Sequence, residues 1–415
     1  MNVLWFATTP SNYKGLNGNG YNGGGWISSL ESEIDKHEDI GLSIAFFSKN
    51  QPFKVRQNRV TYYPMSHPIK SKREKINYFL HYSVEDEAEP YINLFRKIIE
   101  DCKPDIIEIF GSETVLGFAQ SATTVPCVLH IQGILTPYWN AFCPPFISKK
   151  TYLFATYSPI RILKVYKKFK TWTNSCVREL SLLKNISYFI GRTDWDKRMI
   201  SILNPQSCYF YGSEILRQSF YQKLEYKKPE EMTIVSTMSG VMYKGMDLIL
   251  KTAYVLKYMM NQRFTWIVYG DASNLKFFER STSICHSDVN VEMKGVGTEK
   301  DICQTLINAT AFAQTSYIDN SPNAVCEAQI MGCPVVATHV GGLSSLIENG
   351  MDGFLVPAND PYQMAWLLYN LHTDEDLSSK ISKNAKETAS MRHNKKDIVD
   401  SLILTYQKII SLNKE

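Results

Sequence analysis

The stretch TSYIDNSPNAVCEAQIMGCPVVATHVGGLSSLIENGMDGFLVP, residues 315–357, carries most of the evidence about the fold of this 415-residue chain. An apolar run, Ala311–Gln314, precedes it, and a second, Val335–Thr338, lies within it. The residues between them predict a helix over Ala324–Met331. Two apolar strands joined by a helix indicate a parallel β–α–β unit whose sheet is covered on both faces.

The same alternation of short apolar runs and longer helical patterns continues outward in both directions. The other expected strands are Val3–Thr8, Leu42–Phe47, Ile106–Phe110, Cys127–Ile131, Tyr188–Gly191, Thr233–Ser236, Trp266–Gly270 and Val291–Lys294. Further expected helices are Gly25–Glu38, Lys75–Val84, Tyr91–Cys102 and Asp247–Met260. This pattern predicts an α/β fold.

The chain is too long for one such core, so we expect two doubly wound, Rossmann-like domains facing each other across a cleft. A polar, charged segment interrupts the pattern and serves as the boundary. The expected division is 1–216, a linker 217–231, a second domain 232–394 and a C-terminal helix 395–415. The last helix could pack on either domain.

Asp319 and Glu327 form the most informative pair of acids, with seven residues between them. The tetrapeptide between them, Asn320-Ser321-Pro322-Asn323, is typical of a helix start, because polar caps and a proline suit the first turn. We therefore expect a loop carboxylate, free helix amides and a helical carboxylate side by side. Hydroxyl-rich sugars bind carboxylates and diphosphates bind amides, so this arrangement suits a sugar nucleotide. The alternative for Asp319 is a capping role only.

A glycine-rich loop, GLNGNGYNGGG at 15–25, matches the letters of a dinucleotide fingerprint. Its first glycine, however, lies too far beyond the first strand for that fingerprint. The next strand ends in Ser48 and Lys49, so it lacks the acidic residue that would bind a ribose hydroxyl. Gly23, Gly24 and Gly25 lead directly into a helix, where backbone amides can approach an anion closely. We interpret these three glycines as donor-binding, with a surface loop as the alternative.

Composition excludes several classes of protein. The chain carries 45 Lys and Arg against 41 Asp and Glu, which argues against a dedicated nucleic-acid binder. Nine cysteines without a CxxC pair predict reduced thiols in the cytoplasm. The first residues predict a strand rather than a signal peptide, and no apolar run is long enough to span a membrane. No HExxH or other metal-binding pattern occurs, so we expect neither metal nor cofactor.

Positive charge is concentrated in residues 149–198, which carry 12 Lys and Arg but only three acids. Within this block, PIRILKVYKKFKT (159–171) predicts a basic amphipathic helix close to aromatic residues. Such a helix suits an anionic membrane surface, which would be the inner face for a cytoplasmic protein. A solvated helix face is the alternative.

The motifs in 315–357 resemble the retaining glycosyltransferases of family 4, which have the two-domain GT-B fold. That family has Glu, seven residues, Glu-Ala, a small-residue turn and Gly-x-Pro-Val-Val-Ala. This chain has Asp319, Glu327-Ala328 and then the residues Gly332 to Ala337. Val340-Gly341-Gly342 and the segments 22–31 and 191–196 also look like the family. Asp replaces the first Glu, so its side chain reaches one methylene less.

The resemblance implies roles for several residues. Asp319 would contact the donor sugar, and Glu327 would hold the nucleotide ribose. Lys244, in a family-like Lys-Gly step, would offset the charge of the diphosphate; the alternative is a solvated lysine. The arginine expected five residues earlier is Ser239 here, and Arg192 or Lys300 could replace its charge.

His130 is the third candidate catalytic residue, because the family often has a sugar-contacting histidine after the corresponding strand. Counting back from Gly133, however, that position holds Gln132, and residues two apart on a strand share a face. Either side chain could therefore reach the cleft, and a structural histidine is the alternative.

The sequence thus predicts a metal-independent hexosyltransferase that moves a sugar from a nucleotide-diphosphate donor to a saccharide or lipid-linked acceptor, in surface polysaccharide synthesis. No general base is assigned. The alternatives are a sugar-nucleotide epimerase with the same fold and a non-catalytic nucleotide-binding scaffold.

Overall fold

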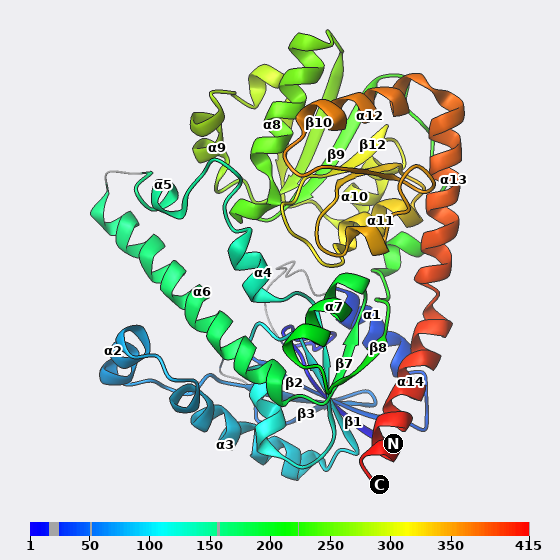
Figure 1. Cartoon of the computed structure of the whole chain (residues 1–415). Helices are drawn as coiled ribbons and strands as arrows, with labels where there is room; N and C mark the ends of the chain where they lie inside the picture. The colour runs from blue at the N-terminus through cyan, green and yellow to red at the C-terminus, as the bar shows by residue number, and fades with distance from the viewer. Residues whose placement is uncertain (16–24, 50–51, 156–157, 223, 415) are drawn as a thin grey trace. The chain divides into compact units, whose positions relative to one another are not determined.

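The computed structural model describes residues 1–15, 25–49, 52–155, 158–222 and 224–414. The chain forms two compact units (Figure 1). The N-terminal unit comprises Met1–Trp139, Lys164–Arg217 and His393–Glu415, and the C-terminal unit comprises Asn140–Leu163 and Gln218–Arg392. Each unit contains one β-sheet with helices packed against it, which confirms the predicted α/β fold.

The N-terminal sheet has eight strands in the order β3-β4-β2-β1-β5-β6-β7-β8. All neighbours pair in parallel except β3 and β4, which are antiparallel. The strands are β1 Asn2–Phe6, β2 Gly41–Phe47, β3 Val55–Gln57, β4 Val60–Met65, β5 Ile106–Phe110, β6 Cys127–His130, β7 Tyr188–Gly191 and β8 Cys208–Tyr211.

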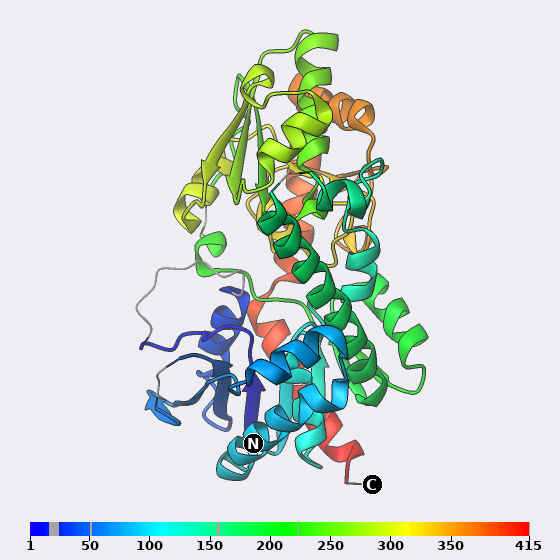
Figure 2. The same cartoon turned by 90° about the vertical axis from the view of Figure 1, so that its left-hand side faces the viewer.

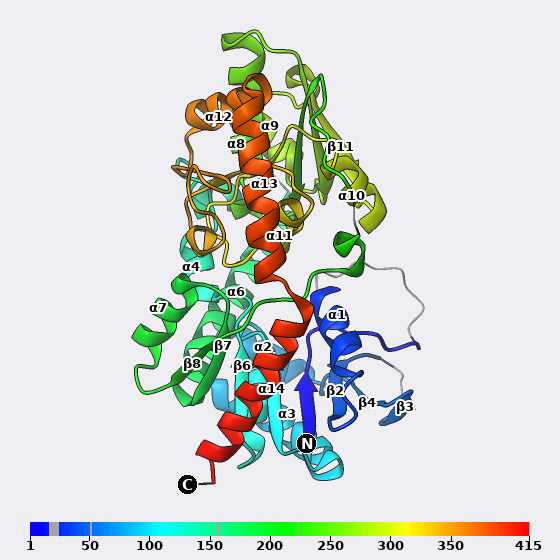
Figure 3. The same ribbon diagram turned by 90° about the vertical axis from the view of Figure 1, so that its right-hand side faces the viewer.

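Helices cover both faces of this sheet (Figures 2 and 3). On one face, Phe95 and Ile98 of α3 pack with Leu4 and Phe6 of β1 in a hydrophobic core. The helices of the unit are α1 Gly25–Ile34, α2 Lys72–Leu80, α3 Val84–Cys102, η1 Val115–Ala122, α4 Leu135–Asn140, α6 Pro159–Asn185, α7 Asp194–Leu203 and α14 Lys395–Leu412. The division between the units falls within the first turns of α6.

The C-terminal helix α14 belongs to the N-terminal unit (Figure 3). Its Tyr406 is fully buried and donates a short hydrogen bond to Glu108 of β5. Trp5 of β1 donates its indole N–H to the Tyr406 hydroxyl at 3.0 Å. The sequence left the partner of this helix open, and these buried polar contacts with two adjacent strands decide it.

The C-terminal sheet has six parallel strands in the order β11-β10-β9-β12-β13-β14. They are β9 Met232–Met238, β10 Phe264–Gly270, β11 Val291–Gly295, β12 Ala311–Gln314, β13 Val335–Thr338 and β14 Phe354–Val356. Its helical segments are α5 Lys149–Leu153, η2 Gln218–Tyr221, η3 Met242–Lys244, α8 Met246–Tyr254, η4 Val255–Met259, α9 Leu275–Thr282, η5 Ser287–Val289, α10 Glu299–Leu306, α11 Asn323–Ile330, η6 Leu343–Ser345, α12 Pro361–Thr373 and α13 Glu375–Arg392.

Residues 140–163 depart from the expected domain boundaries, because they pack in the C-terminal unit. Tyr152 of α5 donates to Asn274 at 3.3 Å, and its ring meets Phe277 edge-on. The Lys251 ammonium of α8 lies 3.7 Å from the centre of the Phe146 ring. These aromatic residues contact helices more than 100 positions later in the chain. No local sequence pattern predicts that residues 140–163 pack in the C-terminal unit.

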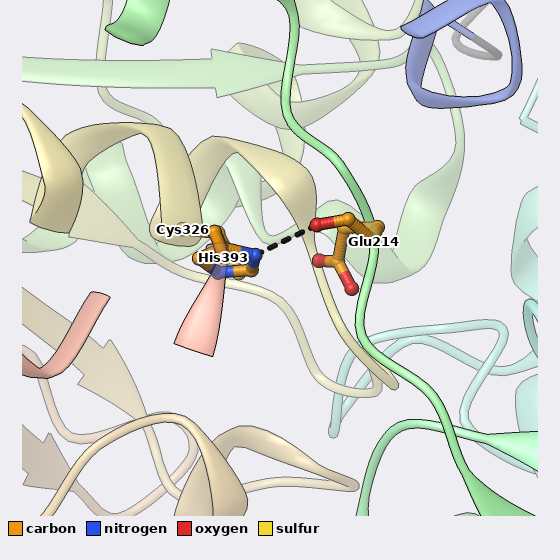
Figure 4. A group of neighbouring side chains, drawn as sticks. All are labelled: Glu214, Cys326 and His393. Atoms are coloured by element: carbon orange, nitrogen blue, oxygen red, sulfur yellow. Dashed lines mark hydrogen bonds between the residues drawn. The ribbon is translucent and has the colours of Figure 1, made fainter. Parts of the chain in front are cut away.

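The expected linker 217–231 also differs, since most of it packs on the C-terminal unit. Within it, the Tyr226 hydroxyl donates to the carbonyl of Ala309 at 2.9 Å. Just before the expected linker, Glu214 of the N-terminal unit accepts a hydrogen bond at its carbonyl from His393 Nδ1 at 2.9 Å (Figure 4). This bond joins the last segment of the first sheet to the segment that leads into α14.

Several other expectations need correction. The helix expected over Lys75–Val84 is the end of α2, a break and the first residue of α3, because Ser83 caps a new helix start. β3, β4, β8 and β14 were not predicted, since they are short or carry polar residues and a proline. Among the described residues, no helix is long and apolar enough to cross a membrane.

Candidate active site

Two loops leave the carboxyl ends of neighbouring strands β9 and β12 and contact each other. The amide of Tyr317 donates to the carbonyl of Tyr243 at 2.7 Å, and the Thr315 hydroxyl donates to the carbonyl of Lys244 at 2.9 Å. Gly245 adopts φ +76°, and a Cβ there would lie 2.0 Å from the Thr315 carbonyl oxygen. The Lys-Gly step therefore needs its glycine so that the two loops can approach each other.

Lys244 and Asp319 form an ion pair at this junction, with 2.7 Å between Nζ and Oδ2. The same carboxylate oxygen accepts hydrogen bonds from Gln314 Nε2 at 2.9 Å and from the Ser316 hydroxyl at 3.0 Å. Asp319 is 6% exposed, and the Lys244 side chain is 20% exposed. The alternatives of a solvated lysine and a capping aspartate are therefore wrong: each side chain binds the other.

Helix α11 begins directly after this pair. Its N-cap is Pro322, which offers no side-chain acceptor to the first amides. Asn320 and Ser321 lie buried just before it, and Asn323 is its first residue. Glu327 lies 4% exposed at the beginning of the second turn. The structure thus brings together the loop carboxylate, the helix start and the helical carboxylate, as the spacing predicts.

Gly341 holds the backbone of Asp319 in place. It adopts φ +53°, and a Cβ at this position would lie 1.8 Å from the Asp319 carbonyl oxygen. The next amide, Gly342, donates to that same oxygen at 3.0 Å. We did not assign a role to this glycine from the sequence. Gln314 and Ser316 were missed as well, although a glutamine ending an apolar strand is a usable signal.

The two candidates for a replacement cation differ in position. Ser239 is exposed after β9 and provides no charge. Lys300 is exposed on α10, which follows the edge strand β11, two strands away from β9. Lys300 therefore lies away from Lys244. Arg192 belongs to the N-terminal unit and is described below.

His130 ends β6 and is 2% exposed. Its Nδ1 lies 2.8 Å from Glu108, the same carboxylate that accepts from Tyr406. Burial lowers the pKa of His130, and Glu108 partly opposes this shift. These contacts tie β6, β5 and α14 together, which is the structural role we weighed as the alternative. Gln132, two residues further on, is the more exposed of the two side chains.

Arg192 follows β7, and its side chain is 4% exposed. Its Nε lies 3.5 Å from the Glu214 carboxylate, and its guanidinium carbon lies 4.2 Å from the centre of the Trp26 ring. Gly25, the residue before Trp26, begins α1, as we expected. Gly23 and Gly24 lie outside the described residues.

Two further buried acids were not predicted: Glu179 of α6, and Glu113, which follows β5. Glu179 of α6 accepts hydrogen bonds from Ser112 and from the amide of Leu135, which begins α4. Burial raises the pKa of Glu179 to about 7, and burial also raises the pKa of the neighbouring Glu113. The hydrogen bonds give Glu179 a position at a helix start rather than a role in chemistry.

The sequence showed no cluster of metal ligands, but within the C-terminal unit the structure brings three potential ligands together. Ligand atoms of Glu279, Cys285 and His286, at and beyond the end of α9, lie within 4.8 Å of one another. Glu279 accepts from the amide of His286 at 3.1 Å and lies 2.6 Å from its Nδ1. These side chains satisfy one another, so a metal is not needed to explain them.

Comparison with known proteins places the site in a family. Residues 218–388 match the model for glycosyl transferases group 1, and this range contains the Lys244–Asp319 pair and α11. The chain is 23% identical over 314 residues to the UDP-Gal:alpha-D-GlcNAc-diphosphoundecaprenol alpha-1,3-galactosyltransferase of Escherichia coli, a match covering 73% of this chain and 75% of that enzyme. The chain is a GT-B glycosyltransferase.

Solved structures agree on the fold of this glycosyltransferase. Sucrose-phosphate synthase from Thermosynechococcus elongatus superimposes with a TM-score of 0.71 over 99% of both chains, at 13% identity. Anabaena Alr3699/HepE, solved with UDP and glucose, gives a TM-score of 0.64 over 98% of this chain and 99% of its own, at 15% identity. At such low identity these neighbours show the fold alone. The family match favours a glycosyltransferase over the epimerase.

Proposed function

We propose that this glycosyltransferase is a retaining enzyme of family 4 that moves a hexose from a nucleoside-diphosphate sugar to a saccharide or lipid-linked acceptor, in surface polysaccharide synthesis. The observation that carries the proposal is the Lys244–Asp319 pair immediately before the uncapped start of α11. The Escherichia coli relative, whose name includes both UDP-Gal and a diphosphoundecaprenol acceptor, supports both substrate classes.

In this proposal the cation and the helix start stabilise the leaving diphosphate. Lys244 supplies a positive charge, and the backbone amides at Asn320, Ser321 and Asn323 supply fixed donors. Asp319 orients the sugar: its Oδ2 is held by Lys244, Gln314 and Ser316, while its Oδ1 accepts no hydrogen bond from any described residue. Oδ1 is therefore the oxygen available to a sugar hydroxyl. His130 acts only by positioning, through its bond to Glu108.

The nucleotide is the first thing to test. A thermal-shift panel of UDP, GDP, ADP and their sugars should show one base raising the melting temperature, because a ligand that binds only the native state stabilises it. We expect the UDP compounds to give the largest shift. Adding an acceptor should then produce a glycosylated product; release of an altered sugar nucleotide without acceptor would indicate an epimerase, and no turnover at all would indicate a scaffold.

Replacing Glu327 with alanine should slow transfer at least about tenfold, because the buried carboxylate holds the nucleotide ribose in this proposal. Glu327→Gln should lose a similar amount, since it keeps the shape of the side chain but not its charge. Glu348→Gln, an exposed acid just outside η6, is the matched control and should retain the wild-type rate. Wild-type rates in both Glu327 variants, measured on proteins with normal melting curves, would contradict the assignment.

We also propose that the reaction needs no metal, because Lys244 and the amides before α11 offset the diphosphate charge. Transfer by the purified enzyme should therefore survive EDTA unchanged. Loss of turnover on chelation that manganese restores would show that the diphosphate is neutralised by a metal ion after all.

The basic segment 159–171 is proposed to bind an anionic membrane surface. No residue of α6 before Asn174 is buried, and Tyr166 is 48% exposed among several exposed lysines. Phe79 of α2 contacts Tyr166 with 5.8 Å between the ring centres. No residue of α2 is buried, and its Ile76 is 57% exposed. α2 thus adds exposed apolar residues and its own Lys72, Arg73 and Lys75 to the surface.

Vesicle sedimentation tests this membrane surface. The protein should bind vesicles containing phosphatidylglycerol at low salt and not pure phosphatidylcholine. Lys167→Gln with Lys168→Gln should weaken binding about thirtyfold, at about 1 kcal/mol per charge. Lys380→Gln with Lys383→Gln removes the same charge from exposed positions on α13 and should change nothing. Equal binding by the two double variants, or none by the wild type, would leave segment 159–171 as a solvated surface.

A further inference from the structure

The N-terminal unit contains a buried carboxyl oxygen that has no hydrogen-bond partner. It is Oε2 of Glu113, a residue that follows β5, and no described residue donates a hydrogen bond to it. A buried acceptor without a donor is costly, and native proteins leave few such groups. In an enzyme, this unpaired oxygen therefore points to a ligand that supplies the missing donor.

The backbone around Glu113 is fixed by its own hydrogen bonds. The Ser112 hydroxyl donates to the Gly133 carbonyl at 3.1 Å and to the Glu179 carboxyl group at 2.5 Å. The carbonyl of Glu113 accepts a hydrogen bond from Arg178 Nη2 at 2.6 Å. Contacts with two other segments of the unit thus hold this loop in place. The free oxygen belongs to a fixed side-chain position and not to a loop without contacts.

Gly111 makes room for the carboxyl group at the end of the strand. It adopts φ +87°, and a Cβ at this position would lie 2.5 Å from Oε2 and 2.8 Å from Cδ of Glu113. The Glu113 side chain therefore folds back over the residue that directly follows β5. This strand lies inside the sheet, between β1 and β6. Ligands of doubly wound sheets bind at the carboxyl ends of such strands.

The chemistry of the free oxygen favours a hydroxyl group over a phosphate. Burial raises the pKa of Glu113, while hydrogen bonds from two backbone amides and the charges of Arg178 and Arg192 oppose this shift. Burial also raises the pKa of Glu179 to about 7. A sugar hydroxyl can donate to a carboxyl oxygen, whereas a phosphate supplies acceptors and adds negative charge. The expected ligand is therefore the hydroxyl-bearing part of a substrate.

We propose that Oε2 of Glu113 accepts a hydrogen bond from a hydroxyl group of the acceptor saccharide. The inference rests on the proposed function, which supplies two sugars, the donor hexose and the acceptor. The pair of Lys244 and Asp319 lies in the C-terminal unit, and Asp319 is already assigned to the donor sugar. Glu113 lies in the N-terminal unit, so it is assigned to the acceptor. It becomes a residue that selects the acceptor.

Steady-state kinetics of the full chain distinguish the two sugars. The probes are UDP-galactose and N-acetylglucosamine diphosphoundecaprenol, the substrates in the name of the Escherichia coli relative. Glu113→Ala should raise the KM for the acceptor at least about tenfold and leave the KM for the donor unchanged, because only the acceptor loses a hydrogen bond. Glu100→Ala, which removes an exposed acid near the end of α3, is the matched control and should behave like the wild type.

Two kinetic outcomes would overturn the proposal. A raised KM for UDP-galactose with an unchanged KM for the acceptor would mean that the donor sugar contacts Glu113. Equal kinetics of Glu113→Ala and Glu100→Ala would mean that neither sugar does. Should the alanine variant fail to fold, Glu113→Asp keeps the acid but reaches one methylene less, and it should raise the acceptor KM several-fold.

Melting curves test Glu113 without any substrate. Glu113→Gln has nearly the same shape but cannot ionise, so it avoids the cost of burying a carboxyl group with a free oxygen. It should melt at or above the wild-type temperature, as expected for a residue kept for function. A lower melting temperature would mean that the carboxyl group stabilises the fold and would overturn the proposal. Failure of the wild type to transfer sugar would argue against the proposed function and leave this melting result intact.

Discussion

Lys244→Ala should slow glycosyl transfer by about tenfold to a thousandfold, the range seen when one fixed charge or donor at a developing anion is removed. The ammonium of Lys244 lies 2.7 Å from Asp319 at the start of α11, so its loss removes both the proposed stabilisation of the leaving phosphate and a contact that orients the carboxylate. Steady-state rates at saturating donor measure the effect on the chemical step.

Folding should survive this substitution. Asp319 keeps its hydrogen bonds from Gln314 and Ser316, and Lys244 is partly exposed, so the melting temperature should change little. Lys300→Ala is the matched control, since it removes an exposed lysine of the same unit two strands away, and it should retain the wild-type rate. A Lys244→Ala enzyme as fast as Lys300→Ala would exclude the charge from catalysis.

Gly341→Ala should have the largest effect on the architecture of the site. The new Cβ would lie 1.8 Å from the Asp319 carbonyl oxygen, at a backbone φ of +53°. The φ alone costs about 1 kcal/mol, and the clash with backbone cannot be relieved by rotating a side chain. The loop that carries Asp319 must therefore move, and we expect transfer to be nearly abolished and the free energy of unfolding to fall by several kcal/mol.

Gly350→Ala separates the cost of the positive φ from the cost of the clash with the Asp319 carbonyl. Gly350 also has a positive φ, of +80°, but a Cβ there would meet nothing within 4 Å. This variant should lose only about 1 kcal/mol of stability in urea unfolding and keep its activity. If Gly341→Ala behaves like Gly350→Ala, the contact with Asp319 does not hold the site together.

The donor-side elements could be predicted because they are local. The loop acid, the helix start and the helical acid all lie between Asp319 and Glu327, so helix geometry and capping chemistry place them together without knowledge of the fold. The ten strands expected from apolar runs are all present, since a buried parallel strand needs a continuous apolar segment whatever its neighbours are. Short or polar strands such as β3 and β8 lack that signal.

The pairing of Lys244 with Asp319 could not be read from the sequence, because it depends on β9 and β12 being neighbours in the sheet. The contacts of His130 could not be read either; the resemblance to the family suggested that His130 or Gln132 reaches the sugar, with a structural histidine as the alternative. Only the structure shows Glu108 beside it, on the adjacent strand, and Tyr406 on a helix almost 300 residues later. A buried histidine with such partners is part of the core.

The sequence by itself therefore determined the fold class and the local donor motif, since strand, helix and cap preferences act within a few residues. Tertiary structure decided which distant residues share a site. It assigned residues 140–163 and α14 to their units, joined Lys244 to Asp319 and placed Arg192 against the start of α1. These contacts follow from strand order and from burial of surfaces far apart in the chain, which no local pattern encodes.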